Sequence, residues 1–400
     1  MQASRPLPLE GVTVVDLTQI YNGPYATYLM AMAGARVIKV EPPEGEHLRQ
    51  RSGTGGAAQP FAMLNGNKLS VTLNLKHARG RELLLQLVAR ADVMVENFAP
   101  GVMERLQFGP EAMLKMNPRL VYASGSGYGS DGPYRDYPAM DLTVQAISGV
   151  MSVTGVSDGL PVKAGPAICD FFGGIHLYGA ITTALFERER TGQGRIVEVS
   201  MMEAVYSSLA SNLGLYYGSG GKAAMRTGNR HGGLSLCPYN VYPARDGFIA
   251  IICNHETHWQ ELLRAMQRED LATDPRTCTI AARVQNMDFV DEALSAWTRR
   301  FDKQDLFQQL LARRVPSAPV RELSEVVADP HLHARGMLES IDHPEFGPMV
   351  LSRSPLRFAG SDNCKLRPSP MLGAHNTEVL GDGLGLSASE LEVLHGEGAV

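Results

Sequence analysis

Apolar residues gather into short runs near the beginning of the chain, and polar or glycine-rich segments separate these runs. The run GVTVVDL at residues 11–17 has the length and composition of a buried strand. Residues 22–34 are small and apolar and end at a glycine, which predicts a helix; ARVIKVEPP at 35–43 predicts a second strand, stopped by prolines. A strand, a helix and a strand within about 30 residues predict a βαβ unit with parallel strands.

The same alternation continues to about residue 130. We expect a strand over 68–76, an amphipathic helix over 77–91, a strand over 92–98, two short helices, and a strand that leads into a glycine- and serine-rich loop. This alternation predicts a doubly wound α/β domain, in which ligands bind beyond the carboxyl ends of the strands. No G-x-G-x-x-G pattern follows the first strand, and the three glycines within 52–56 fall in a predicted loop. An NAD-dependent oxidoreductase is therefore disfavoured.

The pattern changes in the second half of the chain. Helices are expected over 140–151 and 201–217, and a glycine-rich, cationic stretch at 218–235 then indicates a domain boundary. Beyond it we expect a hairpin over 238–254, helices over 256–267, 283–300 and 304–313, and two short antiparallel strands between 337 and 358. A last helix is predicted to begin with the capping box Ser387-x-x-Glu390.

One acidic residue, Asp170, stands where a proline- and glycine-rich loop meets a predicted helix of about 18 residues. No other carboxylate occurs between Asp158 and Glu187, and the neighbours of Asp170 are apolar or small. Asp is a favoured N-cap residue, because its carboxylate accepts hydrogen bonds from the first free N–H groups of a helix. A carboxylate held there in its ionised form would also suit nucleophilic catalysis. Both interpretations stay open on the pattern alone.

Composition places the chain among ordinary globular proteins. Its 400 residues exceed one typical core, so two domains are expected; 44% of the residues are hydrophobic and 20% charged. The formal charge of −5 is spread over both signs, which disfavours nucleic-acid binding. No apolar run approaches the roughly 18 residues of a membrane span, and the first residues do not resemble a signal peptide, so we expect a cytoplasmic protein with no membrane partner.

The cysteines and histidines give no metal or disulfide pattern. The five cysteines are scattered without a C-x-x-C spacing, which predicts a reducing compartment. His231, His255, His258 and His375 do not form a ligand set, so no metal is expected. The thiol of Cys169, beside Asp170, is an alternative nucleophile, although a free cysteine is usually a small buried apolar residue.

Several separated motifs together resemble one family over nearly the whole chain. They are DLTQIYNGPYATYLMAMAGARVIKVEPP, LNGNKLSVTLNLK, DVMVENFAPGVMERL, NPRLVYASGSGYGSDGP, YPAMDLTVQAISGVM, the Asp170-x-x-Gly-Gly segment with ALFERERTGQG, and MLGAHNTEVL. The set resembles the CaiB/BaiF family, the class III coenzyme A transferases. Each motif alone is weak, whereas their number and order are specific.

The resemblance implies a fold and a reaction. It implies an interlocked homodimer in which each chain has a Rossmann-like large domain and a smaller α+β domain: 1–220 for the N-terminal part of the large domain, 221–325 for the small domain with its linkers, and 326–400 for a C-terminal segment that returns to the large domain. In transferases of this family an aspartate at the position of Asp170 is the nucleophile, and it passes through an aspartyl anhydride and an aspartyl-CoA thioester. The CoA thioester is then a substrate, and no permanently bound cofactor is needed.

The resemblance also implies binding residues. The positions carried over to coenzyme A are Tyr21, Asn22, Arg49, Leu73, Asn74, Leu75, Lys76, Asn97, Phe98, Ala99, Arg105, Pro138, Ala139 and Met140. Lys76 and Arg105 are candidate partners of the CoA phosphates, and solvated surface charge is the alternative interpretation of both. Pro42 and Pro138 stand where relatives carry basic residues, which changes the expected contacts with the phosphates.

The family's glycine loop, which closes over the aspartyl intermediate, matches residues 231–234. His231, Gly232 and Gly233 would exclude water there, and a simple linker turn is the alternative. Arg226, Arg230 and His231 are candidates to bind the acceptor acid, since arginine is a natural partner for a carboxylate.

The expected reaction is the transfer of CoA from an acyl-CoA, with succinyl-CoA as the expected donor, to a short dicarboxylate such as oxalate, itaconate, mesaconate or citramalate. An α-methylacyl-CoA racemase of the same fold is the main alternative. It needs a histidine where this chain has Met140, and methionine cannot carry a proton. A non-catalytic CoA-binding subunit is a second alternative, which exchange of CoA by the isolated protein would exclude.

Overall fold

The computed structural model describes residues 5–51, 59–362 and 364–400, so the three glycines within 52–56 lie outside the described residues. The chain divides into two compact units. Unit 1 comprises residues 1–144, 166–205 and 329–400, and unit 2 comprises 145–165 and 206–328. Each unit has a sheet and a hydrophobic core of its own.

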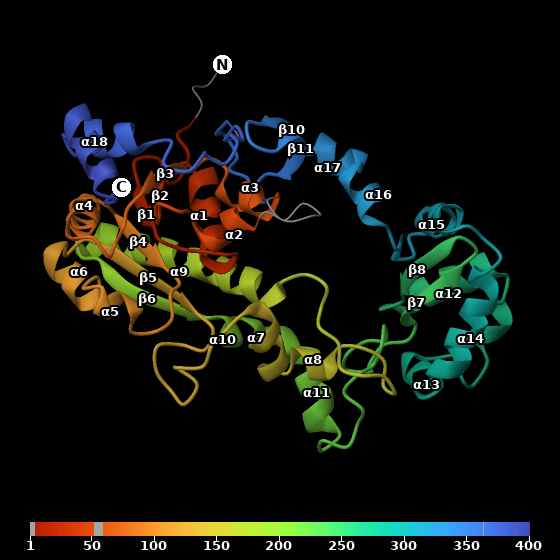
Figure 1. Ribbon diagram of the computed structural model, residues 1–400. Helices are drawn as coiled ribbons and strands as arrows, with labels where there is room; N and C mark the ends of the chain where they lie inside the picture. Colours follow the sequence, from red (N-terminus) through yellow and green to blue (C-terminus); the bar gives the residue numbers. More distant parts are fainter. Residues whose placement is uncertain (1–4, 52–58, 363) are drawn as a thin grey trace. The chain divides into compact units, whose positions relative to one another are not determined.

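A six-stranded sheet in the order β3-β2-β1-β4-β5-β6 forms the centre of unit 1 (Figure 1). Its strands are β1 (Thr13–Asp16), β2 (Arg36–Glu41), β3 (Leu69–Thr72), β4 (Val93–Glu96), β5 (Val121–Ser126) and β6 (Arg195–Ser200), and each pairs in parallel with its neighbours. The chain winds outward from β1 to β3 and then returns to β4 on the other side of β1. The predicted α/β class and parallel sheet are confirmed.

Successive residues of the strands face opposite layers of the core, as the pleat requires. Val14 packs with helices α1 (Asn22–Met32) and α9 (Ile168–Thr191). Val15 packs with helix α4 (Ala78–Ala89) and with residues of the C-terminal segment such as Leu394. Both faces of the sheet are covered, which explains why its strands are nearly continuous apolar runs.

Shorter elements complete unit 1. They are α2 (His47–Gln50), α3 (Gln59–Asn65), α5 (Val102–Arg105), α6 (Pro110–Met116), α10 (Met201–Tyr206), α17 (Pro330–Ala334), the hairpin of β10 (Leu338–His343) and β11 (Gly347–Ser352), the π-helix η3 (Thr377–Asp382) and α18 (Ala388–Gly396). The C-terminal segment follows the edge strand β3, where the Ser70 carbonyl accepts the His375 N–H at 3.0 Å and the Thr72 N–H donates to the Asn376 side chain at 3.0 Å. The predicted Ser387 capping box is confirmed.

Unit 2 has a three-stranded antiparallel sheet, in the order β7-β8-β9, packed with helices. Its elements are α8 (Val150–Val153), the 3-10 helix η1 (Ser207–Leu209), α11 (Ala210–Gly218), β7 (Tyr239–Ala244), β8 (Gly247–Ile252), α12 (Glu256–Met266), the 3-10 helix η2 (Glu269–Ala272), α13 (Ile280–Gln285), α14 (Met287–Thr298), α15 (Lys303–Ala312), β9 (Ser317–Pro319) and α16 (Leu323–Val327). The predicted hairpin around residues 245–247 is confirmed.

Three of the predicted helices are divided in the structure. The single helix expected over 140–151 is two, α7 (Asp141–Ile147) and α8, because Gly149 takes a φ of 93° between them. The expected helices over 201–217 and 283–300 are likewise divided into shorter helices. Helix α9 has 24 residues and a mean hydropathy of 1.2 over an 18-residue window, so by length and composition it could span a membrane. Because 44% of that window is buried inside the protein, α9 does not by itself contradict the expected absence of a membrane partner, which stays a prediction.

Candidate active site

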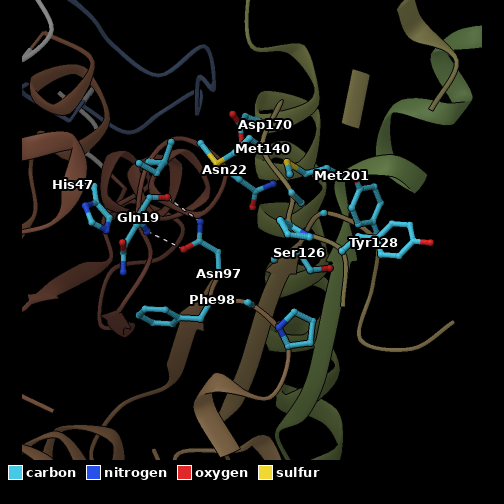
Figure 2. Close-up of a pocket in the computed structure, with 18 of the residues that line it drawn as sticks. Gln19, Asn22, His47, Asn97, Phe98, Ser126, Tyr128, Met140, Asp170 and Met201 are labelled. Atoms are coloured by element: carbon cyan, nitrogen blue, oxygen red, sulfur yellow. Dashed lines mark hydrogen bonds between the residues drawn. The ribbon is translucent and has the colours of Figure 1, made fainter. Parts of the chain in front are cut away.

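A pocket of about 840 Å³ opens in unit 1 beyond the carboxyl ends of β1, β4 and β5 (Figure 2). Strands β1 and β4 are neighbours, but the chain leaves them in opposite directions, and ligands of doubly wound sheets bind in the crevice that this reversal creates. The residues that line it are Gln19, Ile20, Asn22, His47, Gln50, Arg51, Asn97, Phe98, Ala99, Pro100, Gly125, Ser126, Gly127, Tyr128, Arg135, Asp136, Tyr137, Pro138, Ala139, Met140, Asp170 and Met201.

Asp170 lies in this pocket, in the first turn of α9, but it is not the N-cap of that helix. The N-cap is Ala167, and the carboxylate that accepts the first N–H groups comes from another helix. Asp141 Oδ1 accepts the N–H of Cys169 at 2.9 Å and that of Asp170 at 3.3 Å. The capping interpretation of Asp170 is therefore wrong, and Asp141 performs that role.

The Asp170 carboxylate has no hydrogen-bond partner among the described residues, and Asp170 is only 7% exposed. Burial, together with the nearby charge of Asp141, raises the pKa of Asp170 to about 7. The expectation that backbone donors would hold this carboxylate ionised is thus wrong. A carboxylate that water and donors solvate poorly is a stronger base, and a stronger nucleophile once ionised, than an ordinary surface aspartate.

Eight of the predicted site residues meet in the pocket: Asn22, Asn97, Phe98, Ala99, Pro138, Ala139, Met140 and Asp170. Asn97 fixes the loop after β1 to the loop after β4. Its Oδ1 accepts the Gln19 N–H at 2.8 Å, and its Nδ2 donates to the Gln19 carbonyl at 2.8 Å. The two sides of the crevice are therefore joined by one carboxamide.

The other predicted CoA residues of unit 1 do not line this pocket: Tyr21, Arg49, Leu73, Asn74, Leu75, Lys76 and Arg105. Tyr21 stacks on Phe171, next to Asp170, with 6.2 Å between the ring centroids. Asn74 donates from its side chain to the Gly398 carbonyl at 2.9 Å. Lys76 and Arg105 are exposed, and their binding of phosphate stays a prediction.

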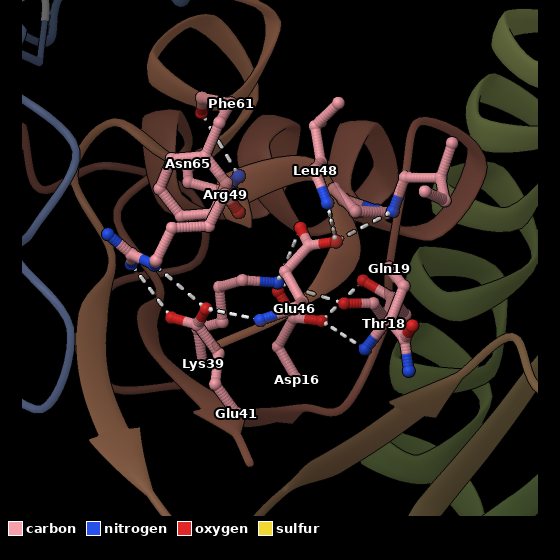
Figure 3. Close-up of polar contacts among 12 residues, drawn as sticks. Asp16, Thr18, Gln19, Lys39, Glu41, Glu46, Leu48, Arg49, Phe61 and Asn65 are labelled. Carbon is pink, nitrogen blue, oxygen red and sulfur yellow. Dashed lines mark hydrogen bonds and ion pairs between the residues drawn. The ribbon is translucent and has the colours of Figure 1, made fainter. Parts of the chain in front are cut away.

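Arg49 belongs to a network of buried charges behind the loop after β1 (Figure 3). Its guanidinium donates to both oxygens of Glu41, at 2.9 and 2.8 Å, and lies 4.0 Å from the centre of the Phe61 ring. Because that side chain is only 8% exposed and already paired, the structure gives Arg49 a partner other than a phosphate.

Glu46 connects the same network to the pocket wall. Its Oε2 accepts the N–H of Ile20 at 3.3 Å and that of Leu48 at 3.0 Å, and its Oε1 lies 3.5 Å from Lys39 Nζ. Ile20 has a φ of 66°, which a β-branched residue rarely adopts. Such a conformation persists only where its surroundings hold it, as Glu46 does here.

The predicted glycine-loop residues lie in unit 2. His231 Nδ1 accepts the Gly233 N–H at 3.2 Å, and the Cβ that Gly232 lacks would lie 3.0 Å from the Asn212 side chain. Arg230 Nε donates to Asp291 Oδ2 at 2.8 Å, and its other nitrogen to Asp288 at 2.6 Å.

Arg226 Nε donates to the Val156 carbonyl at 3.1 Å, and a second guanidinium nitrogen donates to the Gly159 carbonyl at 2.9 Å. Arg226 and Arg230 therefore have partners within unit 2, and their contact with an acceptor acid stays a prediction.

Sequence reasoning missed the basic residues of the pocket. His47 is the first residue of the short helix α2, Arg51 follows its last residue, and Arg135 lies in the loop before α7. The two guanidinium groups give the pocket positive charge of the kind that binds phosphate. For His47 and Arg51 a signal was available, because both lie near a strand end that the sequence already predicts to bind a ligand. Within the described part of the chain, no group of three or more His, Cys, Asp or Glu residues could hold a metal ion.

Comparison with known proteins identifies the family. The sequence profile of CoA-transferase family III matches residues 9–376. A formyl-CoA:oxalate CoA-transferase of Streptomyces avermitilis is 37% identical over 98% of this chain and 99% of its own length, and a succinyl-CoA:mesaconate CoA-transferase of Haloarcula marismortui is 36% identical over 93% and 95%. The crystal structure of a CaiB/BaiF family protein from Brucella suis superposes with a TM-score of 0.83 at 33% identity, covering 94% of this chain and all of that one. The chain therefore belongs to CoA-transferase family III and is a transferase enzyme.

Proposed function

We propose that this enzyme moves coenzyme A from an acyl-CoA to a short dicarboxylic acid, with the Asp170 side chain as the acyl carrier. The observation that supports it most directly is the carboxylate of Asp170, buried in the pocket without a partner and with a pKa raised to about 7. The relatives named above transfer CoA to oxalate or mesaconate. Succinyl-CoA is the proposed donor, and oxalate and five-carbon acids are the proposed acceptors.

The proposed steps conserve an activated carbonyl throughout. An Asp170 oxygen attacks the thioester carbonyl, the C–S bond breaks, and a mixed anhydride and CoA thiolate result. The thiolate attacks the aspartyl carbonyl, which releases the donor acid and leaves an aspartyl-CoA thioester. The acceptor carboxylate then displaces CoA to form a second anhydride, and CoA thiolate takes the new acyl group and frees Asp170. No net proton transfer and no redox step is needed.

Cys169 is a poor alternative nucleophile. It is fully buried, and burial, with the charges of Asp141 and Asp170, raises the pKa of its thiol to about 12. Thiolate, the nucleophilic form, would then be scarce at neutral pH. Asp170, in contrast, is about half ionised near pH 7.

We also propose how coenzyme A is held, and in which assembly and compartment the enzyme works. Arg51 and Arg135, which line the pocket, supply positive charge for the CoA phosphates in this proposal. The water-excluding role of residues 231–233 stays a prediction. An interlocked homodimer in the cytoplasm remains part of the proposal, as does the absence of a nucleic-acid partner, which the formal charge of −5 supports.

Trapping the intermediate tests this function. The enzyme is incubated with succinyl-CoA, treated with hydroxylamine or borohydride, digested and analysed by mass spectrometry, and the modification is expected on Asp170. The Asp170→Ala enzyme is expected to lose transfer by about 10⁴-fold or more while it still folds, because the nucleophile is absent. A Cys169→Ala enzyme serves as the control and should keep the Asp170 modification.

A screen of acceptors with succinyl-CoA and acetyl-CoA defines the substrate class. Transfer by Asp170→Ala at the wild-type rate, or a modification that maps to Cys169, would contradict the proposal. Exchange of the α-hydrogen of a 2-methylacyl-CoA with solvent deuterium, without transfer, would instead support the racemase.

A further inference from the structure

The carboxamide of Asn22 is buried in the pocket wall. Asn22 is 4% exposed, and neither its Oδ1 nor its Nδ2 has a partner among the described residues. A buried amide without a hydrogen bond destabilises the fold, so such a group calls for an explanation. Asn97, in the same wall, shows the usual outcome, since both of its polar atoms are paired.

Glycines of two other elements make the space that this carboxamide occupies. A Cβ on Gly125 of β5 would lie 2.5 Å from Asn22 Oδ1, and a Cβ on Gly173 of α9 would lie 2.1 Å from Asn22 Nδ2. A Cβ on Gly174 would lie 2.6 Å from the Asn22 carbonyl. Gly125, Gly173 and Gly174 have no side chain, and any side chain at these positions would displace Asn22.

The same glycines place Asn22 beside the nucleophile. Gly173 and Gly174 follow Asp170 by three and four positions, and residues at that spacing share one face of a helix. Figure 2 shows Asn22, Asp170 and Met140 among the residues that line the pocket. The unpaired amide thus lies about one helical turn from the carboxylate that is proposed to attack the thioester.

We propose that Asn22 is a catalytic residue, whose Nδ2 donates a hydrogen bond to the acyl oxygen when Asp170 attacks the carbonyl carbon. This inference rests on the proposed function. The attack turns the carbonyl oxygen into an oxyanion, and a fixed amide donor stabilises that charge without transferring a proton. An amide that has no competing partner in the free enzyme loses no existing hydrogen bond when it makes this one.

Met201 lies close to the same space. Its side chain lines the pocket, and its Cγ lies 3.0 Å from the position that a Cβ on Gly173 would take. Methionine is unbranched and has three rotatable bonds, so it can change rotamer at little cost when the acyl group enters.

The test is the Asn22→Leu enzyme, which keeps the approximate shape of the side chain and removes its polar atoms. Single-turnover formation of the Asp170 adduct from succinyl-CoA is expected to slow by about 100- to 1000-fold, with little change in KM. The melting temperature is expected to stay or rise, because no hydrogen bond is lost on folding. Asn97→Leu, which removes a paired carboxamide, should instead lower it.

Other outcomes would overturn the inference. Wild-type rates of adduct formation in Asn22→Leu and in the smaller Asn22→Ala would show that the amide takes no part in the reaction. A fall in activity that only accompanies a fall in melting temperature would show a structural role. Asp170→Ala, assayed in parallel, separates the two proposals: if it retains transfer, the proposed function fails, and if it alone loses transfer, only the role of Asn22 fails.

Discussion

Two buried aspartates in unit 1 differ in their partners more than in their burial. Asp16, at the end of β1, is fully buried, and Asp170 is 7% exposed. Asp16 accepts hydrogen bonds from the Thr18 N–H at 2.9 Å, the Thr18 hydroxyl at 2.5 Å, the Thr27 hydroxyl at 2.7 Å and Lys68 Nζ at 2.9 Å. Asp170 accepts none from the described residues.

The pKa values of the two groups move in opposite directions for this reason. Burial alone would raise the pKa of Asp16, but the charges of Lys68 and Lys39 and the two threonine hydrogen bonds outweigh it, so the pKa lies below its usual value. Burial acts on Asp170 unopposed, and Asp141 adds to it, so the pKa rises to about 7. The comparison teaches that pairing decides whether a buried carboxylate serves stability or chemistry.

Removal of the partner of Asp16 should give the largest effect on stability. In Lys68→Met the carboxylate of Asp16 would remain buried and lose its closest cation, and we expect a loss of about 3–5 kcal/mol in the free energy of unfolding. Denaturant unfolding measures it. Arg79→Met, which breaks the exposed pair with Glu82, is the matched control and should cost less than about 1 kcal/mol. Equal losses in the two variants would contradict the comparison.

A smaller effect of opposite sign is expected at Asp170. The folded protein holds the proton of Asp170 up to about pH 7, whereas an unfolded aspartate releases it near 3.8. This group therefore costs little stability below about pH 4, destabilises the fold increasingly as the pH rises from about 4 to about 7, and costs a constant amount above that. Asp170→Asn, which cannot ionise, should therefore be more stable than the wild type by about 3–4 kcal/mol at pH 8 and close to it at pH 4. Thermal unfolding at both pH values measures the difference. A constant gap at all pH values would show that the pKa of Asp170 is not raised.

The smallest expected effect concerns the neighbour of Asp170. Asp141→Asn removes a negative charge, while the amide oxygen still accepts the two N–H groups at the start of α9. The pKa of Asp170 should then fall, and the pH at which kcat/KM is half-maximal should move below 7 by less than about one unit. Asp136→Asn, an exposed carboxylate of the pocket, is the control and should leave that midpoint in place. A midpoint that moves to higher pH in Asp141→Asn would contradict the assignment.

The sequence predicts the sheet better than it predicts the protonation of the buried carboxylates. The apolar runs around Val14 and Val93 are long enough to identify strands, and their alternation with helices identifies the parallel sheet. Asp170 stands out because its neighbours are apolar. Its pKa depends on Asp141, which is 29 positions away in the sequence and meets it only through the fold.

The same limit applies to the surroundings of Arg49 and Asn22. Arg49 lies near a predicted binding loop, but its pairing with Glu41 depends on the path of the chain between β2 and α2. The resemblance places Asn22 at the coenzyme, yet the lack of a partner for its amide follows from Gly125 and Gly173, on two distant elements. Hydrogen bonds and ion pairs between residues that are distant in the sequence cannot be inferred from local composition.

Glu46 has a consequence for ligand recognition. One carboxylate binds the N–H of Ile20 in the loop after β1 and the N–H of Leu48 in α2, so two stretches that border the pocket share a single anchor. Segments that are already ordered lose little conformational entropy when a ligand arrives, and more of the contact energy then remains as affinity. The mouth of this pocket is thus prepared before a ligand reaches it.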